Sequence, residues 1–382
     1  MTPRIQPDDQ HQVEYVTGQD ELTAAQAAHD GPPTGQGRLR IGFSFWGFLG
    51  HGVTDTPDGG RFWRRPIVDA LTAAGHQVIL LQANRDAAEA GQDLPYQWES
   101  GFPALDILLA EWRWPMPDRN TTACGSTGHT CDLHRQNDLI GHYTAAGTAT
   151  LIWDTDRQLP ADDALRELPH VIVGDPALLP TPGTVSLLAP VPDHLLDEAD
   201  PQKLAARHRP LPLAYVGNQY DRDHDFEEFF VPAATRFRHR VAGKWPRTSR
   251  WPAVNFTGRC PFPEVQDIYL GALCTVLLNP RRYSSVGAVS QRRFEAPLAG
   301  CLPIAPTTLA QAAAFTPEIL LAADGREVIE RIEWAQRIAG TAEHAAVIGD
   351  CLTRLAPFRL STWTPRLLQV LHTLTATAKA KP

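Results

Sequence analysis

The feature that most constrains the fold is a repeated alternation of short apolar runs with amphipathic stretches. Residues 39–45 (LRIGFSF) form one apolar run, residues 61–77 carry a helical stripe after a glycine-rich loop, and residues 77–82 (QVILLQ) are apolar again. This order predicts a strand, a helix and a second strand parallel to the first. A parallel sheet needs helices on both faces.

The same alternation continues to the end of the chain. After a Pro-rich stretch at 189–212, which is typical of a linker, a second series begins at 213–217. Two consecutive doubly wound halves are the simplest account, so we expect an α/β protein with two Rossmann-like domains facing a central cleft. Further apolar runs of strand length lie at 106–110, 149–154, 170–174, 185–189, 239–243, 273–279 and 301–305.

Composition sets broad limits on location and partners. Hydrophobic residues make up 43% and charged residues 20%, which is typical of a globular protein. The net charge is −8, so the protein as a whole does not attract nucleic acid or anionic membranes. The polar N-terminus lacks the apolar core of a signal peptide, and no apolar run is long enough to span a membrane, so we expect a cytoplasmic location.

Two common nucleotide fingerprints are absent. The loop from Gly47 to Gly52 reads G-x-x-G-x-G rather than G-x-G-x-x-G, and Gln82 stands where an acidic ribose ligand would end the second strand. Residues 242–245 (AGKW) lack the rest of a P-loop. Nicotinamide and P-loop chemistry are therefore disfavoured. The loop itself either faces the cleft or serves only as a connector.

The most informative segment is 273–306, where Glu295 lies in a predicted helix among apolar neighbours. A carboxylate in such surroundings needs a partner, and a vicinal diol can supply two hydroxyl donors. A helix starting near Gly287 or Ser290 would present free N–H groups to a diphosphate. Together the two ends match a nucleoside diphosphate. The alternative is that Arg292 and Glu295 form a surface salt bridge at i,i+3.

The stretch 290–301 reads S-x-R-x-F-E-A-x-x-x-G-C and resembles the donor-binding motif of GT-B glycosyltransferases, most closely the CgeB-like (spore-maturation-type) family. The resemblance is good over about 213–306 and extends to the N-terminal half only in outline. Supporting pieces lie upstream in the expected order, namely YVGN at 215–218, AGKW at 242–245, FTG at 256–258 and DIY at 267–269.

The resemblance implies a role for each matching residue. Glu295 would hold the donor ribose, Arg292 and the loop after the strand would hold the diphosphate, and Lys244 would face it. Related retaining enzymes have E-x7-E, but the first glutamate position here is Gly287, so the stereochemical outcome stays open. The other donor-binding candidates in these motifs are Ser284, Ser285, Gly287, Gly217 and Asn218.

The implied activity is transfer of a hexosyl or pentosyl group from a nucleotide-diphosphate sugar, such as a UDP-sugar, to a hydroxyl. The implied organisation is a flexible tail over 1–37, an acceptor domain over 38–205, a donor domain over 206–360, and a C-terminal helix over 361–382 that returns toward the first domain. Neither a tightly bound cofactor nor a metal is expected at the donor site, because no Asp-x-Asp motif lies there.

Glycosyl transfer to a hydroxyl needs either a base near the acceptor or a leaving phosphate that acts as the base. Charged residues at predicted strand ends are the candidates, and Asp55 and Asp58 in the first loop are preferred, with His51 beside them. Either aspartate can instead be a turn or capping residue. Glu111, Arg113 and Asp154 follow later strands and are expected to line the acceptor side of the cleft.

Two further patterns have two interpretations each. Cys124, His129, Cys131 and His134 are zinc-type ligands, but their cramped spacing favours an irregular loop. The basic stripe (residues 236–251) can track a phosphate backbone, or can be solvated surface. Its candidate nucleic-acid contacts are Arg238, Arg240, Arg247 and Trp245.

The acceptor therefore stays open between a hydroxymethylpyrimidine base in DNA and a glycan, protein or small molecule. Two other functions are compatible with the sequence. One is a nucleotide-sugar epimerase or hydrolase, and the other is a non-catalytic module that binds nucleic acid through the basic stripe.

Overall fold

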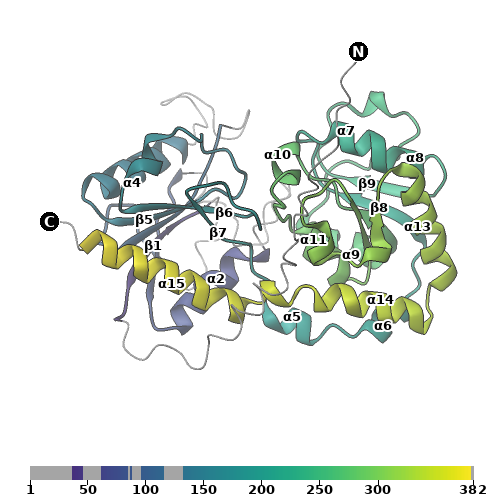
Figure 1. The fold of residues 1–382 in the computed structure, drawn as a ribbon. Coiled ribbons are helices and arrows are strands. Elements are labelled where there is room, and N and C mark those ends of the chain that lie inside the picture. The colour runs from purple at the N-terminus through teal and green to yellow at the C-terminus, as the bar shows by residue number, and fades with distance from the viewer. Residues whose placement is uncertain (1–36, 46–61, 85–86, 88–95, 116–131, 380–382) are drawn as a thin grey trace, which may run out of the picture. The chain divides into compact units, whose positions relative to one another are not determined.

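The structure, a computed structural model, describes residues 37–45, 62–84, 87, 96–115 and 132–379 (Figure 1). Residues 38–382 belong to one unit. Among its described residues, every strand pairs in parallel with its neighbours, and these strands form two sheets of seven and five strands. The prediction of an α/β architecture with two parallel sheets is confirmed.

The first sheet has the strand order β3-β2-β1-β4-β5-β6-β7. Each strand predicted in this half is present, and the two-residue β3, which is too short to give a sequence signal, is added at the edge. The bounds are β1 (Arg40–Ser44), β2 (Gln77–Leu80), β3 (Gln97–Trp98), β4 (Ile107–Glu111), β5 (Ala149–Trp153), β6 (Val171–Asp175) and β7 (Thr184–Ser186).

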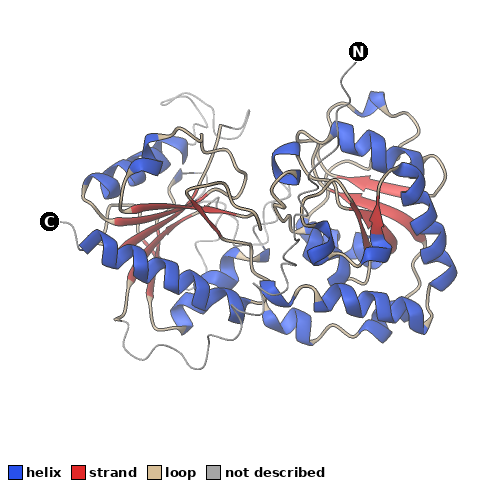
Figure 2. Cartoon of the chain, in the orientation of Figure 1, coloured by secondary structure: helices blue, strands red, loops and turns tan. Residues whose placement is uncertain are grey.

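Alternate residues of this sheet enter two different apolar clusters, as buried parallel strands require. Phe43 and Leu109 face α2 and the C-terminal helix, whereas Leu108 and Ala110 face α4. Figure 2 shows these helices on either side of the sheet. The bounds of the helical elements in this half are α2 (Arg64–Ala73), α4 (Asp132–Ala145) and η2 (Ala164–Glu167).

The second sheet has the order β12-β11-β10-β8-β9. Tyr215 and Val276 face α13, whereas Ala214 and Val216 face α9 and α11. Its strands are β8 (Leu211–Val216), β9 (His239–Ala242), β10 (Ala272–Val276), β11 (Leu302–Pro306) and β12 (Leu321–Ala322). The run 253–258 forms only one bridge, from Phe256 to Val241.

The helices around the second sheet include one irregular segment. Residues 223–234 are divided into α7 (Asp223–Asp225), a π-helical turn η3 (Phe226–Phe230) and α8 (Val231–Ala234). The others are α5 (Asp193–Asp197), α6 (Pro201–Ala206), η4 (Thr248–Arg250), α9 (Phe262–Leu270), α10 (Arg281–Ser284), α11 (Arg292–Leu298), α12 (Ala312–Phe315), η5 (Glu318–Leu320), α13 (Gly325–Ile338), α14 (Ala342–Thr353) and η6 (Ala356–Phe358).

The last helix, α15 (Leu360–Lys379), packs on β5 and α2 of the first sheet. Its buried stripe contains Leu367, Leu371 and Leu374. It begins at Leu360, and the Asp193 carboxylate accepts the Ser361 N–H at 2.8 Å near this start. No helix in the described part of the chain is long and apolar enough to cross a membrane.

Candidate functional site

Glu295 lies on α11 with an unpaired carboxylate. Its side chain is half-buried, and among the described residues it forms neither a hydrogen bond nor an ion pair. The surface salt bridge with Arg292 is therefore not formed. Burial raises the pKa of Glu295 to about 7, although the nearby Arg292 guanidinium opposes the shift. The Glu295 carboxylate thus has no hydrogen-bond donor among the described residues, and a ligand with hydroxyl groups can supply one.

Arg292 turns away from Glu295 toward the carboxyl edge of the second sheet. One Nη atom donates to the carbonyl of Val216, the last residue of β8, at 3.5 Å. The other donates to the carbonyl of Leu278, just after β10, at 3.0 Å. The guanidinium lies 5.4 Å from the ring centre of Tyr215, and its buried Nε has no hydrogen-bond partner. α11 itself begins only at Arg292, later than the predicted start near Gly287 or Ser290, and has seven residues.

A second arginine, Arg222, faces the same tyrosine and was missed in the sequence. It is 7% exposed, and one Nη donates to the Tyr215 hydroxyl at 3.1 Å and to the Asn218 carbonyl at 2.5 Å. Burial and the neighbouring Arg292 lower its pKa. Among the described residues, neither Arg222 nor Arg292 forms an ion pair with a carboxylate. Two guanidiniums thus share one tyrosine, and among the described residues neither is held in an ion pair.

The glycines at the ends of β8 and β9 bring this edge close together. A Cβ atom at Gly217 would lie 2.7 Å from Arg292 Nη1, and one at Gly243, whose φ is +136°, would lie 2.1 Å from the Gly217 carbonyl oxygen. The Asn218 side chain accepts the backbone N–H of Lys244 at 2.8 Å. The Lys244 side chain is exposed. The structure therefore brings Gly217, Asn218 and Arg292 together, with the Lys244 backbone beside them, and their donor-binding role stays a prediction.

The loop over 284–287, which is predicted to hold the diphosphate, packs against the backbone of Ala310. The Ser284 carbonyl accepts the Ala310 N–H at 2.8 Å. Gly287 has a φ of +64°, and a Cβ there would lie 2.8 Å from the Ala310 carbonyl oxygen. Ser285 is exposed. These contacts fix the loop backbone, but they do not by themselves show a phosphate site.

The charged residues predicted at the first sheet's edge are engaged with the protein itself. Arg64 donates to both oxygens of Glu111 at 2.7 Å, and both side chains are 2% exposed. Arg113 donates to the Ser44 hydroxyl at 3.1 Å and to the Phe45 carbonyl. These interactions stabilise the strand ends.

Asp154 behaves in the same way. Its carboxylate accepts the backbone N–H groups of Gln158 and Leu159 at 2.8 Å each, and its pKa is raised by burial. This arrangement is that of a turn-capping carboxylate. Glu111, Arg113 and Asp154 therefore sit at strand ends as predicted, but each has partners within the protein.

Several predicted residues lie outside the described part of the chain. These include the three base candidates of the first loop, His51, Asp55 and Asp58, and three of the four zinc-type ligands, Cys124, His129 and Cys131. Their roles stay predictions. Among the described residues, no group of three or more His, Cys, Asp or Glu side chains is placed to hold a metal ion.

The basic stripe is largely neutralised by acidic neighbours. Arg240 lies 3.8 Å from Glu264, and Arg247 lies 2.7 Å from Asp223. Arg238 donates to the backbone carbonyl of residue 210. Trp245 is 8% exposed, and its ring lies 4.4 Å from that of Phe226 in a buried aromatic cluster. Trp245 therefore has no exposed face for stacking on a base, contrary to its predicted role.

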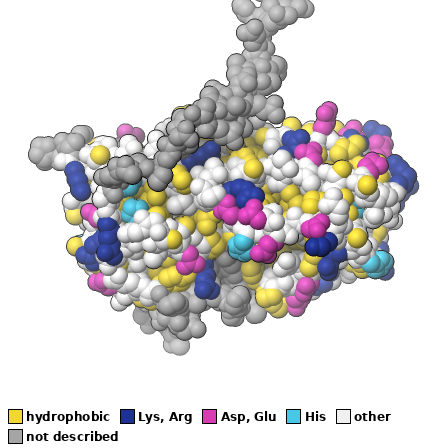
Figure 3. Space-filling view, turned by 90° about the horizontal axis from the view of Figure 1, so that it is seen from below, with side chains coloured by type: hydrophobic (Ala, Val, Ile, Leu, Met, Phe, Trp, Pro, Cys, Tyr) yellow, Lys and Arg dark blue, Asp and Glu magenta, His cyan; other side chains and the backbone are white. Residues whose placement is uncertain are grey.

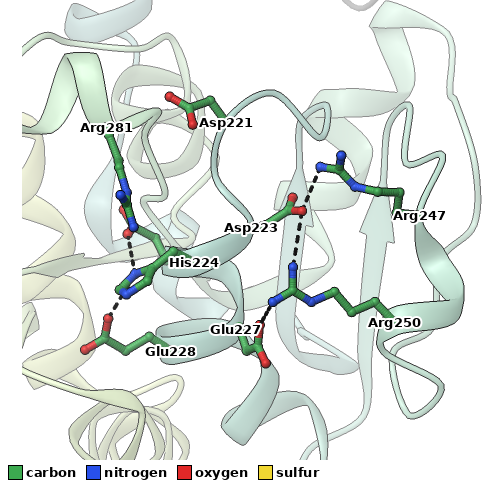
Figure 4. Close-up of a pocket in the computed structure, with 9 residues that line it drawn as sticks. Asp221, Asp223, His224, Glu227, Glu228, Arg247, Arg250 and Arg281 are labelled. Carbon is green, nitrogen blue, oxygen red and sulfur yellow. Dashed lines mark hydrogen bonds and ion pairs between the residues drawn. The ribbon is translucent and has the colours of Figure 1, made fainter.

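A pocket of about 630 Å³ is lined by residues of the segment 221–228 and by three arginines from elsewhere in the chain. Figure 4 shows Arg247 and Arg250 converging on Asp223, and His224 directed at Glu228. Its arginines are mostly paired and carboxylates outnumber them, so it is unsuited to a diphosphate. The lining residues are Asp221, Asp223, His224, Asp225, Glu227, Glu228, Arg247, Arg250 and Arg281.

A comparison with protein families matches the part of the chain that contains the residues described above. A family model described as glycosyl transferase-like matches residues 222–350, which contain Arg222, Arg292 and Glu295. No curated protein matches the sequence.

Solved structures resemble nearly the whole chain at low identity. BGT of phage T4 in complex with UDP and Mn²⁺ is 11% identical with a TM-score of 0.59, covering 87% of this chain and 99% of that one. A glycosyltransferase from Rickettsia africae is 11% identical (TM-score 0.56; 89% and 99% covered). An α-glucosyltransferase in complex with UDP-glucose and DNA containing an abasic site is 9% identical (TM-score 0.56; 88% and 100% covered). The fold is that of GT-B glycosyltransferases.

Proposed function

We propose that this protein is a glycosyltransferase that moves a sugar from a nucleoside diphosphate sugar to a hydroxyl acceptor. The observation that carries the proposal is the pair of guanidiniums on Tyr215. Arg222 and Arg292 lie at the carboxyl edge of the second sheet without a carboxylate partner among the described residues. Ligands of open α/β sheets bind at this edge.

A diphosphate fits this charge arrangement better than a single carboxylate does. It carries two negative charges, and arginine donates to phosphate oxygens in a fixed fork geometry. During transfer the bond from the sugar to the diphosphate breaks, and negative charge grows on the leaving group. Positioned guanidiniums would stabilise that charge most strongly in the transition state.

Glu295 supplies the complementary end of the donor site. An ionised carboxylate offers about four acceptor positions, so it can accept hydrogen bonds from both hydroxyls of a ribose. The raised pKa means that the ionised form predominates only above about pH 7. We therefore assign the diphosphate to Arg222 and Arg292, and the ribose to Glu295. The motif around Glu295 supports membership of the CgeB-like group as part of this proposal.

UDP is the preferred nucleotide of the proposal, because structural neighbours were solved with UDP or UDP-glucose. The acceptor is less constrained. One neighbour is a DNA-modifying enzyme and another was solved with DNA, which supports a hydroxymethylpyrimidine base as one candidate. The neutralised basic stripe does not favour DNA, however. Figure 3 likewise shows acidic and basic side chains interspersed over the face that it presents.

Donor turnover tests the proposal. The protein is incubated with a panel of UDP-, GDP- and dTDP-sugars, and release of the nucleoside diphosphate is followed with and without candidate acceptors. Duplex DNA with and without hydroxymethylcytosine forms one matched pair of acceptors, and a glycan mixture forms another test. We expect release with at least one donor, accelerated by one acceptor class. Absence of both donor binding and release across the panel would contradict the assignment.

A further inference from the structure

Tyr269 has a buried hydroxyl without a hydrogen-bond partner. Its side chain lies on α9 and is 0% exposed, and its ring packs in the apolar cluster formed by Val216, Ala296 and their neighbours. The other three buried tyrosines of the described residues each use their hydroxyl. Tyr143 donates to the Pro103 carbonyl at 2.8 Å, Tyr283 donates to Asp156 at 2.7 Å, and Tyr215 accepts from Arg222.

A buried hydroxyl without a partner destabilises the folded protein, because it loses its hydrogen bonds to water on folding. Such a group is expected where a ligand, or a side chain that moves when the ligand binds, completes the hydrogen bond. An unpaired acceptor that acts electrostatically on Tyr269 lies outside the apolar cluster itself. It belongs to the residue that precedes Ala296 on the neighbouring helix.

That residue is Glu295. Helix α9 packs against α11, and Tyr269 and Ala296 belong to the same buried cluster at this contact. Burial and the Glu295 carboxylate raise the pKa of Tyr269 well above its usual value, so the hydroxyl stays protonated and can only donate to an anion. An unpaired donor and an unpaired acceptor therefore lie at the same helix–helix contact.

We propose that Tyr269 is a positioning residue, whose hydroxyl donates to the Glu295 carboxylate when the donor ribose is bound. This inference rests on the proposed function of Glu295. One hydrogen bond from Tyr269 would fix the rotation of the carboxylate and leave its other acceptor positions for the two ribose hydroxyls. The hydrogen bond would then hold the bound carboxylate in the orientation that accepts both ribose hydroxyls.

The test is Tyr269→Phe, which removes only the hydroxyl. We expect the donor Kd, measured by calorimetry with a UDP-sugar that binds the wild type, to rise about tenfold, as for loss of one hydrogen bond to a charged group. The rate at saturating donor should stay within about twofold. Without the hydrogen bond to its ionised form, Glu295 should also titrate at higher pH, so the pH midpoint of donor binding should move upward.

Tyr143→Phe is the matched control, because it removes a buried tyrosine hydroxyl that already has a partner, the Pro103 carbonyl. It should lower the melting temperature and leave the donor Kd unchanged, whereas Tyr269→Phe should not lower the melting temperature. A Tyr269→Phe protein with the donor Kd and pH midpoint of the wild type would overturn the inference and leave the proposed function intact. A wild type that binds no nucleotide sugar would overturn both.

Discussion

The two sheets have the same parallel architecture but use the charges at their carboxyl edges differently. On the first sheet, two of the three guanidinium nitrogens of Arg64 donate to Glu111, and Asp154 caps a turn. On the second sheet, Arg222 and Arg292 share Tyr215 without a carboxylate partner among the described residues, and Glu295 is unpaired. The charges that stabilise the fold are paired within the chain, whereas the charges to which we assign the donor form no ion pair among the described residues.

From this contrast we expect the largest loss of stability when a paired charge at the edge of the first sheet is removed. Replacing Glu111 with Gln leaves the buried Arg64 guanidinium without its bidentate carboxylate. We expect the free energy of unfolding to fall by about 3 kcal/mol, as is typical when one partner of a buried ion pair is removed. Urea unfolding measures the loss. The donor Kd of the folded variant should stay within about twofold of the wild type.

The opposite result at Glu111 would remove the contrast. If Glu111→Gln lost little stability but most of its donor affinity, the first sheet's edge would hold the donor. The assignment of the donor site to the second sheet would then be wrong.

Arg222 should show the reverse pattern. Arg222→Met removes a guanidinium that the proposal assigns to the diphosphate, so the donor Kd should rise about a hundredfold, equivalent to about 2.7 kcal/mol. Arg222→Lys keeps the charge but loses the fork of donors, so it should recover only part of the affinity. Calorimetric titration with a UDP-sugar measures both variants.

Arg209→Met is the matched control for Arg222. Arg209 is also a largely buried guanidinium beside the second sheet, but its donors go to backbone carbonyls at the opposite edge, including those of Tyr269 and Ala272. Its loss should lower stability and leave the donor Kd of the folded protein unchanged. Equal losses of donor affinity in the Arg209 and Arg222 variants would indicate a general structural effect rather than a binding role.

Much of the fold could be predicted from the sequence, because buried parallel strands appear as short apolar runs between amphipathic helices. β3 could not be found, since two residues give no pattern. The contact of Asp193 with the start of α15 could not be predicted either, because the two segments are far apart in the sequence. The π-helical turn at 226–230 has no sequence signal that separates it from an α-helix.

The candidate site was only partly accessible from the sequence. Glu295 could be singled out because it is a carboxylate among apolar neighbours. Arg222 lies between Asp221 and Asp223, a charged sequence that is typical of an exposed loop. Only the structure shows that its side chain is buried against Tyr215. At the first sheet, Glu111 and Asp154 were placed correctly at strand ends, but sequence alone could not show their partners.

The central claim is that the ionised Glu295 carboxylate holds the donor ribose. The most direct test is the UDP-sugar Kd at pH 8 and pH 6 for the wild type and for Glu295→Gln. Because the pKa of Glu295 is raised to about 7 and the diphosphate stays ionised, wild-type affinity should fall about tenfold from pH 8 to pH 6. Glu295→Gln should bind weakly at both pH values. A Gln variant that binds as tightly as the wild type at pH 8, with the same pH dependence, would contradict the account.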